Sequence, residues 1–258
     1  FDSVFCGSDQ IWNSEITKGI DPMYFADRFP GSVIKASYAA SIGKSALSDA
    51  DCKAMLPLVS RLDRISVREP EAAGLIEKLT GNRPEVVVDP TILAGKELFA
   101  PIVKSLRDRP YVLYYQLARK DNRALSLADK IARYKNLDLV GLSGNRGLQI
   151  GKGHDVICDA GPEEFVSLIA AADYVVTDSF HGTVFSLLFH RPFASIPKAT
   201  RGGRITNLLD IAGLRNRYTD RFDRDILLKD IDWGNVDSSL AREREASEHF
   251  VTSVKGDF

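Results

Sequence analysis

The sequence predicts an α/β protein with two parallel-sheet domains. Short runs rich in β-branched and aromatic residues alternate with segments of helical spacing along the whole chain. A polar, irregular stretch at residues 94–109 divides this alternation into two series. Strands that alternate with helices pair in parallel, because each crossover helix returns the chain to the same edge of the sheet. The 258 residues allow one large domain or two small ones, and the two series favour two.

The first series occupies residues 1–100 and predicts the first domain. Its expected strands are residues 4–6, 33–40, 64–67 and 86–88. Its expected helices are residues 49–58 and 70–81. Pro70 stands in the first turn of the second helix, a position that tolerates proline.

The second series occupies residues 110–234 and predicts the second domain. Its expected strands are residues 111–116, 137–142, 156–157, 174–177 and 193–197. Its expected helices are residues 122–134, 162–172, 180–190 and 204–214. Residues 235–258 form a third segment, where we expect a charged helix that packs back on the first domain. The apolar spacing of Leu240, Phe250, Val251 and Val254 supports that packing.

Composition argues against several classes of protein. The net charge of −1 gives no general attraction to nucleic acid or to acidic membranes. The 3 cysteines are scattered, fit neither a disulfide framework nor a zinc cluster, and favour a reducing cytoplasm. No apolar run approaches the roughly 20 residues of a membrane span. We therefore expect a cytoplasmic protein without a metal site. Because the chain starts without Met inside an expected strand, we also expect that a piece precedes Phe1.

The stretch ADYVVTDSFHGTVFSLLFHRPF at residues 172–193 predicts a strand, a turn and a helix. Such a turn lies at the carboxyl edge of the strands, where ligands bind in open α/β sheets. His181 falls in the first helical turn, and Gly182 beside it is expected to let a ligand approach the backbone. The positive helix end disfavours a cationic imidazole, so we expect His181 to be neutral until an anion binds and then to become an acid.

Five motifs together carry a family resemblance. They are GSDQIWN (7–13), SYAASIG (37–43), ISVREP (65–70), VVDPT (87–91) and TDSFHGTVFSLLF (177–189). Each is moderately specific alone, whereas five in this order are a strong indication. The chain resembles the polysaccharide pyruvyl transferase family over nearly its whole length.

The resemblance implies a two-domain GT-B architecture with the active site between an acceptor-side first domain and a donor-side second domain. It implies transfer of a pyruvyl group from phosphoenolpyruvate to two hydroxyls of a sugar, which forms a ketal in a cell-surface or exopolysaccharide glycan. Phosphoenolpyruvate would be a co-substrate, with no further cofactor. The acceptor would be a sugar or a lipid-linked glycan, and a homo-oligomer is compatible with the family.

The resemblance also suggests residues of the donor site. His181 matches the family's catalytic histidine. Well-studied members carry Arg-x-His, but Ser179 stands here in place of that arginine. We expect Ser179 and Gly182 to contact the donor through their backbone, and Arg201 and Arg204 to replace the missing anion contact, because arginine binds carboxylates and phosphates in a bidentate manner.

Arg68 matches a family arginine that contacts the donor, and we expect it to be catalytic. The alternative is a surface ion pair with Glu69 or Glu71. The acceptor sugar is expected to bind the GSDQIWN motif, through Gly7, Ser8, Asp9, Gln10 and Trp12. Tryptophan can stack on a sugar face and carboxylates bind hydroxyls, but a buried Trp12 beside a structural Asx turn explains the motif equally well.

Two other functions remain open. A GT-B glycosyltransferase that uses a nucleotide-sugar would share the two-domain plan. Nucleotide would then protect the protein against thermal unfolding where phosphoenolpyruvate would not. A non-catalytic glycan-binding protein is the second alternative, because Ser179 departs from the family motif. It would bind sugar without releasing phosphate.

Overall fold

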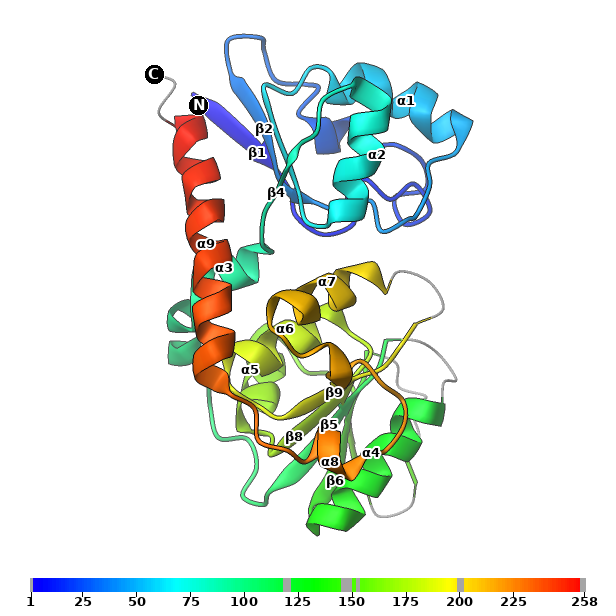
Figure 1. Cartoon of the computed structure of the whole chain (residues 1–258), viewed down its shortest axis with the longest axis vertical. Coiled ribbons are helices and arrows are strands. Elements are labelled where there is room, and N and C mark those ends of the chain that lie inside the picture. The colour runs from blue at the N-terminus through cyan, green and yellow to red at the C-terminus, as the bar shows by residue number, and fades with distance from the viewer. Residues whose placement is uncertain (1, 118–121, 145–149, 152–153, 199–201, 256–258) are drawn as a thin grey trace. The chain divides into compact units, whose positions relative to one another are not determined.

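The computed structural model describes residues 2–117, 122–144, 150–151, 154–198 and 202–255. The chain divides into two compact units (Figure 1): Phe1–Leu93 together with Ser239–Phe258, and Ala94–Ser238. Each unit contains one sheet in which all neighbouring strands are parallel, so the predicted α/β class is confirmed. Among the described residues, no helix is both long and apolar enough to cross a membrane.

The sheet of the first unit has the strand order β1-β2-β3-β4. The strands are β1 (Ser3–Cys6), β2 (Ile34–Ala40), β3 (Arg64–Val67) and β4 (Glu85–Val86). The helices are the 3-10 turn η1 (Pro22–Phe25), α1 (Asp49–Val59) and α2 (Pro70–Thr80). Because the strands are parallel, the loops that follow them gather at one edge of the sheet.

Two apolar clusters form the core of the first unit. One places Met55 of α1 and Ile76 of α2 against residues of β2 and β3. The other packs Phe250, from the C-terminal half of α9 (Trp233–Lys255), against Tyr38 of β2. The last helix of the chain thereby contributes to the core built by the first strands.

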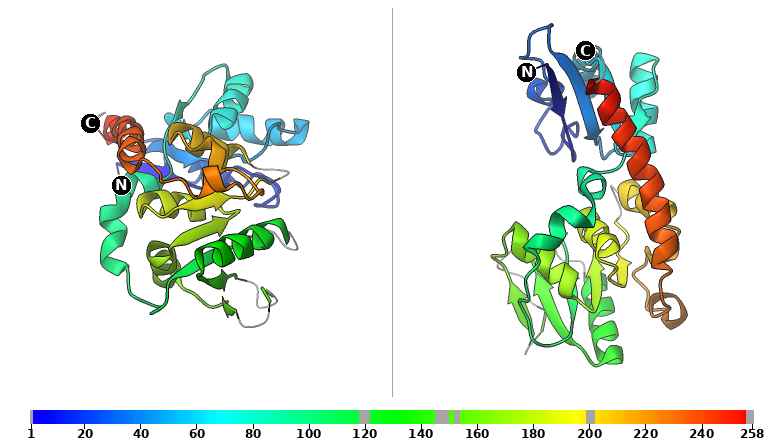
Figure 2. Two further views of the ribbon diagram at one scale, coloured as in Figure 1. Left: turned by 60° about the horizontal axis from the view of Figure 1, so that its bottom comes forward. Right: turned by 90° about the vertical axis from the view of Figure 1, so that its left-hand side faces the viewer.

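The sheet of the second unit has the order β7-β6-β5-β8-β9. Its strands are β5 (Tyr111–Tyr115), β6 (Asp138–Leu142), β7 (Asp155–Ile157), β8 (Tyr174–Thr177) and β9 (Phe193–Ser195). Its helices and 3-10 turns are η2 (Ala100–Ile102), α4 (Asn122–Lys135), α5 (Pro162–Ala171), α6 (Phe180–Leu188), α7 (Gly203–Ile211), η3 (Arg215–Arg217) and α8 (Arg224–Leu227). Figure 2 shows helices on both sides of this sheet.

The centre of the second sheet is a topological switch point. After β5 the chain continues to β6 on one side, whereas after β8 it continues to β9 on the other side. The connections that leave β5 and β8 therefore diverge at the carboxyl edge. Open α/β sheets bind ligands at this position.

The main departure from the sequence prediction is the stretch around the expected linker. Residues 94–109 were expected to be irregular, but the chain forms α3 (Pro90–Phe99) and η2 there. Pro90 starts the helix, and Gly95 interrupts it with a φ of 73°, a left-handed value that glycine adopts without strain. The interrupted apolar spacing explains why the helix is not visible in the sequence. The boundary between the two units falls beside this interruption.

Candidate active site

The turn between β8 and α6 is held by hydroxyl groups. Ser179 is the N-cap of α6, and its Oγ accepts a hydrogen bond from the Gly182 N–H at 3.3 Å. The Ser179 N–H donates to Thr177 Oγ1 at 3.0 Å. Two of the N–H groups that were expected to face an anion are bonded within the turn itself.

Gly182 is required by packing. A Cβ atom at this position would lie 2.6 Å from Thr177 Oγ1, which is closer than real contacts allow. The sequence suggested that Gly182 leaves space for a ligand, but that space is occupied by the side chain of Thr177. The residue therefore lets α6 pack tightly on β8, a different reason from the one proposed from sequence.

His181 is placed differently from the rest of its helix. The other residues of α6, all within the described part of the chain, are buried, whereas His181 is only half-buried. Its ring meets the Phe180 ring edge-on, with 5.4 Å between the centroids. The first turn of α6 carries the positive end of the helix dipole. The imidazole is thus accessible at a position that favours negative charge.

Arg204 lies beside the first residue of α6. It is the second residue of α7, and its guanidinium lies over the Phe180 ring, 5.6 Å from the centroid. The side chain therefore brings a positive charge next to the N-terminus that carries His181. Arg201, the other expected anion contact, lies outside the described residues.

Three further side chains at this edge were not singled out from sequence. Asp178 is buried, and its Oδ1 accepts a hydrogen bond from the Leu117 N–H at 2.7 Å, which ties the end of β8 to the end of β5. Lys198, after β9, places its Nζ 3.4 Å from Asp178 Oδ2. Gln116, after β5, is 8% exposed, and its Nε2 has no hydrogen-bond partner among the described residues. Asp178 and Gln116 directly follow strands and Lys198 comes shortly after β9, and that position was the available signal.

Tyr115 connects this turn to the central strand. Burial raises the pKa of its hydroxyl, and a hydrogen bond with the Ser179 side chain partly opposes that effect. The phenol therefore stays neutral at physiological pH. Together these residues place Arg204, and the ion pair of Lys198 with Asp178, around the hydroxyl-capped start of α6.

The carboxyl edge of the first sheet is organised around Arg68. This residue follows β3 and is 4% exposed. Its NH1 contacts Asp89 Oδ2 at 2.5 Å, and its NH2 contacts Asp9 Oδ1 at 2.8 Å. Burial acts to lower the pKa of the guanidinium, but the two carboxylates outweigh burial and raise it. The surface ion pair with Glu69 or Glu71 that the sequence left open is wrong, because Arg68 is buried and pairs with other carboxylates.

Glu69 holds the loop that follows β2. Its Oε1 accepts hydrogen bonds from Ser41 Oγ at 2.8 Å and from the backbone N–H groups of Ile42 and Gly43, each at 3.1 Å. The side chain is 3% exposed. Sequence reasoning treated Glu69 only as a candidate surface partner of Arg68. Its role in the structure is to fix the SYAASIG motif against the end of β3.

The GSDQIWN motif is largely structural. Trp12 is 1% exposed, stacks on Phe25 with 5.0 Å between the ring centroids, and donates its Nε1–H to a backbone carbonyl. Its indole face is covered by the core, so the expectation that Trp12 stacks on a sugar is wrong. Ser8 Oγ donates to the Ala39 carbonyl at 2.9 Å, and Gln10 Oε1 accepts from Asn13 at 2.9 Å.

Gly7 has a steric role in the same motif. A Cβ atom at this position would collide with the backbone carbonyl of Tyr38. Asp9 differs from these residues, because 61% of its side chain is accessible to solvent while its carboxylate pairs with Arg68. The motif therefore presents one anchored carboxylate and packs most of its other side chains.

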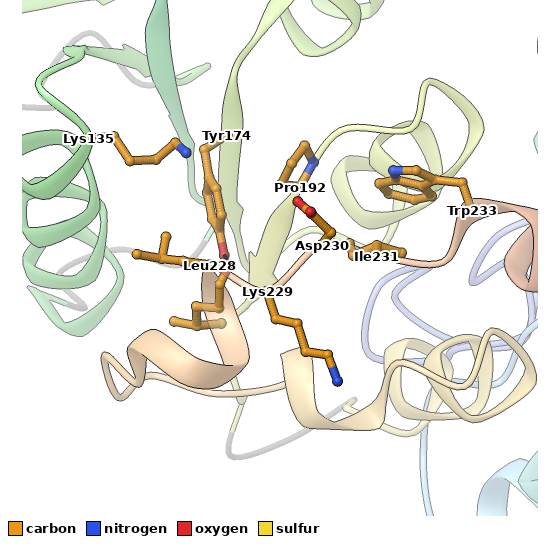
Figure 3. Close-up of a pocket in the computed structure, with 9 residues that line it drawn as sticks. Lys135, Tyr174, Pro192, Leu228, Lys229, Asp230, Ile231 and Trp233 are labelled. Atoms are coloured by element: carbon orange, nitrogen blue, oxygen red, sulfur yellow. Dashed lines mark hydrogen bonds between the residues drawn. The ribbon is translucent and has the colours of Figure 1, made fainter.

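A cavity of about 260 Å³ lies in the second unit at the opposite edge of the sheet (Figure 3). Tyr174 begins β8 and Pro192 directly precedes β9, so both mark the amino ends of strands. Lys135, Asp230 and Trp233 complete much of the wall. Because open α/β sheets bind substrates at the carboxyl ends, this cavity is not the candidate active site. Among the described residues, no cluster of His, Cys, Asp or Glu is arranged to hold a metal ion.

Comparison with solved structures defines the class of the fold. The chain is similar to a protein from Listeria monocytogenes described as a UDP-N-acetylglucosamine 2-epimerase, with a TM-score of 0.55 at 12% identity over 96% of this chain and 67% of that one. The UDP-GlcNAc 2-epimerase from Methanocaldococcus jannaschii gives a TM-score of 0.53 at 12% identity, covering 93% and 68%. The S. aureus MnaA–UDP complex gives 0.54 at 13% identity, covering 96% and 67%. The chain therefore has the GT-B fold.

The family follows from the sequence. The family model for polysaccharide pyruvyl transferase matches residues 1–197, which include Asp9, Arg68 and His181. The chain belongs to the polysaccharide pyruvyl transferase family. No curated protein matches the chain by sequence.

Proposed function

We propose that this protein transfers a pyruvyl group from phosphoenolpyruvate to two hydroxyls of a sugar in a cell-surface or exopolysaccharide glycan, where it forms a ketal. Membership of the family supports transferase chemistry on a polysaccharide. Phosphoenolpyruvate serves as co-substrate, without a further cofactor. The acceptor is a sugar or a lipid-linked glycan, and the reaction takes place in the cytoplasm.

The observation that carries the proposal is the accessibility of His181 at the start of α6. Phosphoenolpyruvate carries a carboxylate and a phosphate, and helix N-termini attract such anions. Arg204, beside Phe180, adds a positive charge at the same position. A histidine here can deliver a proton to the vinyl CH2 of the bound donor, which makes the adjacent carbon electrophilic.

Ser179 takes a different part from the arginine that it replaces. Its hydroxyl caps α6 and bonds Tyr115, so it orients the helix that presents His181. The positive charge that the family places at this position comes instead from α7, through Arg204. The second unit is thus the donor side, and the first unit, with the exposed carboxylate of Asp9, is the acceptor side.

The test is to incubate the purified protein with phosphoenolpyruvate and a panel of oligosaccharides that end in hexoses or N-acetylhexosamines. Mass measurement should find an oligosaccharide heavier by one pyruvyl ketal. A parallel series with UDP-sugars addresses the GT-B glycosyltransferase alternative, which the similar epimerase structures motivate at the level of fold. Sugar transfer from a UDP-sugar, without any ketal from phosphoenolpyruvate, would contradict the proposal.

A further inference from the structure

The charges around Arg68 are not explained by stability. Arg68 and Asp89 each have 2% of the side chain exposed, so this pair is buried and already neutral as a whole. Asp9 adds a second carboxylate to the same guanidinium, although 61% of its own side chain is accessible to water. An exposed ion pair stabilises a fold by only about 0–1 kcal/mol. The Arg68–Asp9 contact therefore needs another reason.

The backbone around Asp9 is fixed as firmly as its side chain. Asp9 adopts a φ of 61°, a left-handed conformation that aspartate tolerates better than most residues. Its carbonyl accepts hydrogen bonds from the N–H groups of Ile11 and Ser41, both at 2.9 Å. An isolated bridge to Ala40 connects it to the end of β2. Both the main chain and the carboxylate of Asp9 are therefore held in one orientation.

This carboxylate lies at the edge of the sheet where open α/β folds bind ligands. Asp9 follows β1, Arg68 follows β3 and Asp89 follows β4, so all three stand at the carboxyl edge of the first sheet. Buried ion pairs contribute little stability over apolar packing, but they can fix a geometry. The series Asp89, Arg68, Asp9 runs from the interior to the surface and ends in an accessible, oriented oxygen acceptor.

We infer that Asp9 accepts the proton of the attacking sugar hydroxyl, and that Arg68 and Asp89 are positioning residues that hold Asp9 for this step. The inference rests on the proposed pyruvyl transfer. An anchored carboxylate beside a cation is a weak base, but a hydroxyl becomes strongly acidic as its oxygen bonds to carbon. Position then matters more than basicity.

The protons balance over the reaction. In the first step the O–H bond breaks toward Asp9, the oxygen bonds to the central carbon of the donor, and the double-bond electrons take a proton at the CH2. In the second step the carbon–phosphate ester bond breaks, the second hydroxyl bonds to the same carbon, and its proton leaves with the phosphate. The proton held by Asp9 then passes through solvent to His181, the proposed acid, so that both side chains return to their starting protonation states.

The experiment uses the acceptor oligosaccharide from which the unaltered protein makes most ketal. Asp9→Asn retains an oxygen for Arg68 but cannot take a proton, so kcat should fall about 10²–10⁴-fold. KM for the oligosaccharide and the thermal unfolding midpoint should change little. Formate should restore part of the activity of Asp9→Ala, because a small carboxylate can occupy the vacated space.

Two further variants separate positioning from packing. Arg68→Lys keeps a positive charge opposite Asp89, but an ammonium group cannot hold two carboxylates as the planar guanidinium does. The value of kcat should therefore fall by about 10²-fold, and the thermal unfolding midpoint should change less. Glu77→Gln is the matched control, because Glu77 forms an exposed pair with Arg83 at 2.6 Å in the same unit. It should leave turnover unchanged.

The outcomes are distinguishable. If the unaltered protein makes no ketal, the proposed function and this inference both fail. If it makes ketal and Asp9→Asn turns over within a few-fold of it, the inference alone is overturned. A loss confined to KM, with kcat unchanged and no rescue by formate, also overturns it, because Asp9 would then only bind the sugar.

Discussion

The carboxyl edges of the two sheets are built in opposite ways. The first edge buries formal charge: Arg68 is enclosed between Asp89 and Asp9, and Glu69 holds the neighbouring loop. The second edge relies on a short, hydroxyl-capped helix that presents one half-buried histidine beside Arg204. Charge pairs orient an oxygen acceptor, whereas a helix start with a nearby arginine attracts an anion. The contrast agrees with the proposal that the second unit binds the donor and the first unit binds the acceptor.

The same contrast predicts which substitutions affect the stability of the protein and which affect its turnover. Removing a residue of the first edge exposes or unpairs a buried charge, which affects folding. His181, in contrast, is only half-buried at the start of α6. We therefore expect substitutions of the buried Arg68 and Asp89 to change stability and turnover together. Conservative substitutions of the exposed Asp9 and substitutions of His181 should mainly change turnover.

The largest expected effect is at His181. His181→Ala should reduce ketal formation by about 10²–10⁴-fold, the usual contribution of a positioned acid. His181→Gln should lose nearly as much ketal formation, because glutamine can form hydrogen bonds but has no proton to transfer. Titration calorimetry should find phosphoenolpyruvate affinity much less affected, since Arg204 and the start of α6 remain. A His181→Gln protein with near-normal turnover would make His181 a positioning residue.

Arg68→Met tests the buried charges of the first edge. It removes the guanidinium that faces the buried carboxylate of Asp89, so the free energy of unfolding in urea should fall by about 3–5 kcal/mol. Arg83→Met is the control, because Arg83 pairs with Glu77 on the surface, with 52% and 45% of the side chains exposed. It should cost about 0–1 kcal/mol. Equal effects of the two variants would show that the Arg68 network is not buried as described.

Alanine substitution of two helix glycines should change the free energy of unfolding in opposite directions. Gly182→Ala in α6 forces a Cβ against Thr177 and should destabilise the protein by about 1–3 kcal/mol. Gly74 in α2 has no atom within 4 Å of the equivalent Cβ position, so Gly74→Ala should stabilise by up to about 1 kcal/mol through helix propensity. Urea unfolding of both variants measures this. A neutral Gly182→Ala would argue against the tight contact between α6 and β8.

A modest effect is expected at Asp51, in the first turn of α1. Burial acts to raise the pKa of this carboxyl, but hydrogen bonds with Ser14, Ser48 and Lys44 outweigh it and lower the pKa. Asp51 also completes the capping box of α1 with Ser48. Because the folded pKa lies below the unfolded value of about 3.9, its stabilisation is present above that pH and is lost as the pH falls through the folded value.

Asp51→Asn should therefore lower the free energy of unfolding at neutral pH by about 0.5–2 kcal/mol. The difference from the unaltered protein should shrink as the pH falls below the unfolded value of about 3.9 and through the lower folded pKa, where the aspartate becomes uncharged like the asparagine. Urea unfolding of both proteins at neutral and at acidic pH measures this difference in the free energy of unfolding. A difference that stays constant with pH would assign the effect to packing rather than to charge.

Local pattern was enough to predict much of this architecture. The strand, turn and helix around His181 were predictable because β-branched residues, an N-cap serine and helical spacing follow one another within a short stretch. The placement of Arg68 at a strand end was predictable for the same reason. These features depend on neighbours in the sequence.

The features that were missed depend on distant residues. Trp12 is buried because η1 brings Phe25 against it, and no local signal distinguishes that from an exposed indole. The Asp89, Arg68 and Asp9 network assembles from three different strand ends, so its pairing follows from sheet order rather than from spacing. The same holds for Asp178, whose partners Leu117 and Lys198 follow β5 and β9.

The most direct test of the central claim is to measure inorganic phosphate and ketal in the same reaction of phosphoenolpyruvate with an acceptor oligosaccharide. Pyruvyl transfer predicts one phosphate for each ketal formed by the unaltered protein, and a parallel loss of both products in His181→Gln. Phosphate release without ketal, or with a yield independent of the oligosaccharide, would mean that the protein hydrolyses the donor and would contradict pyruvyl transfer.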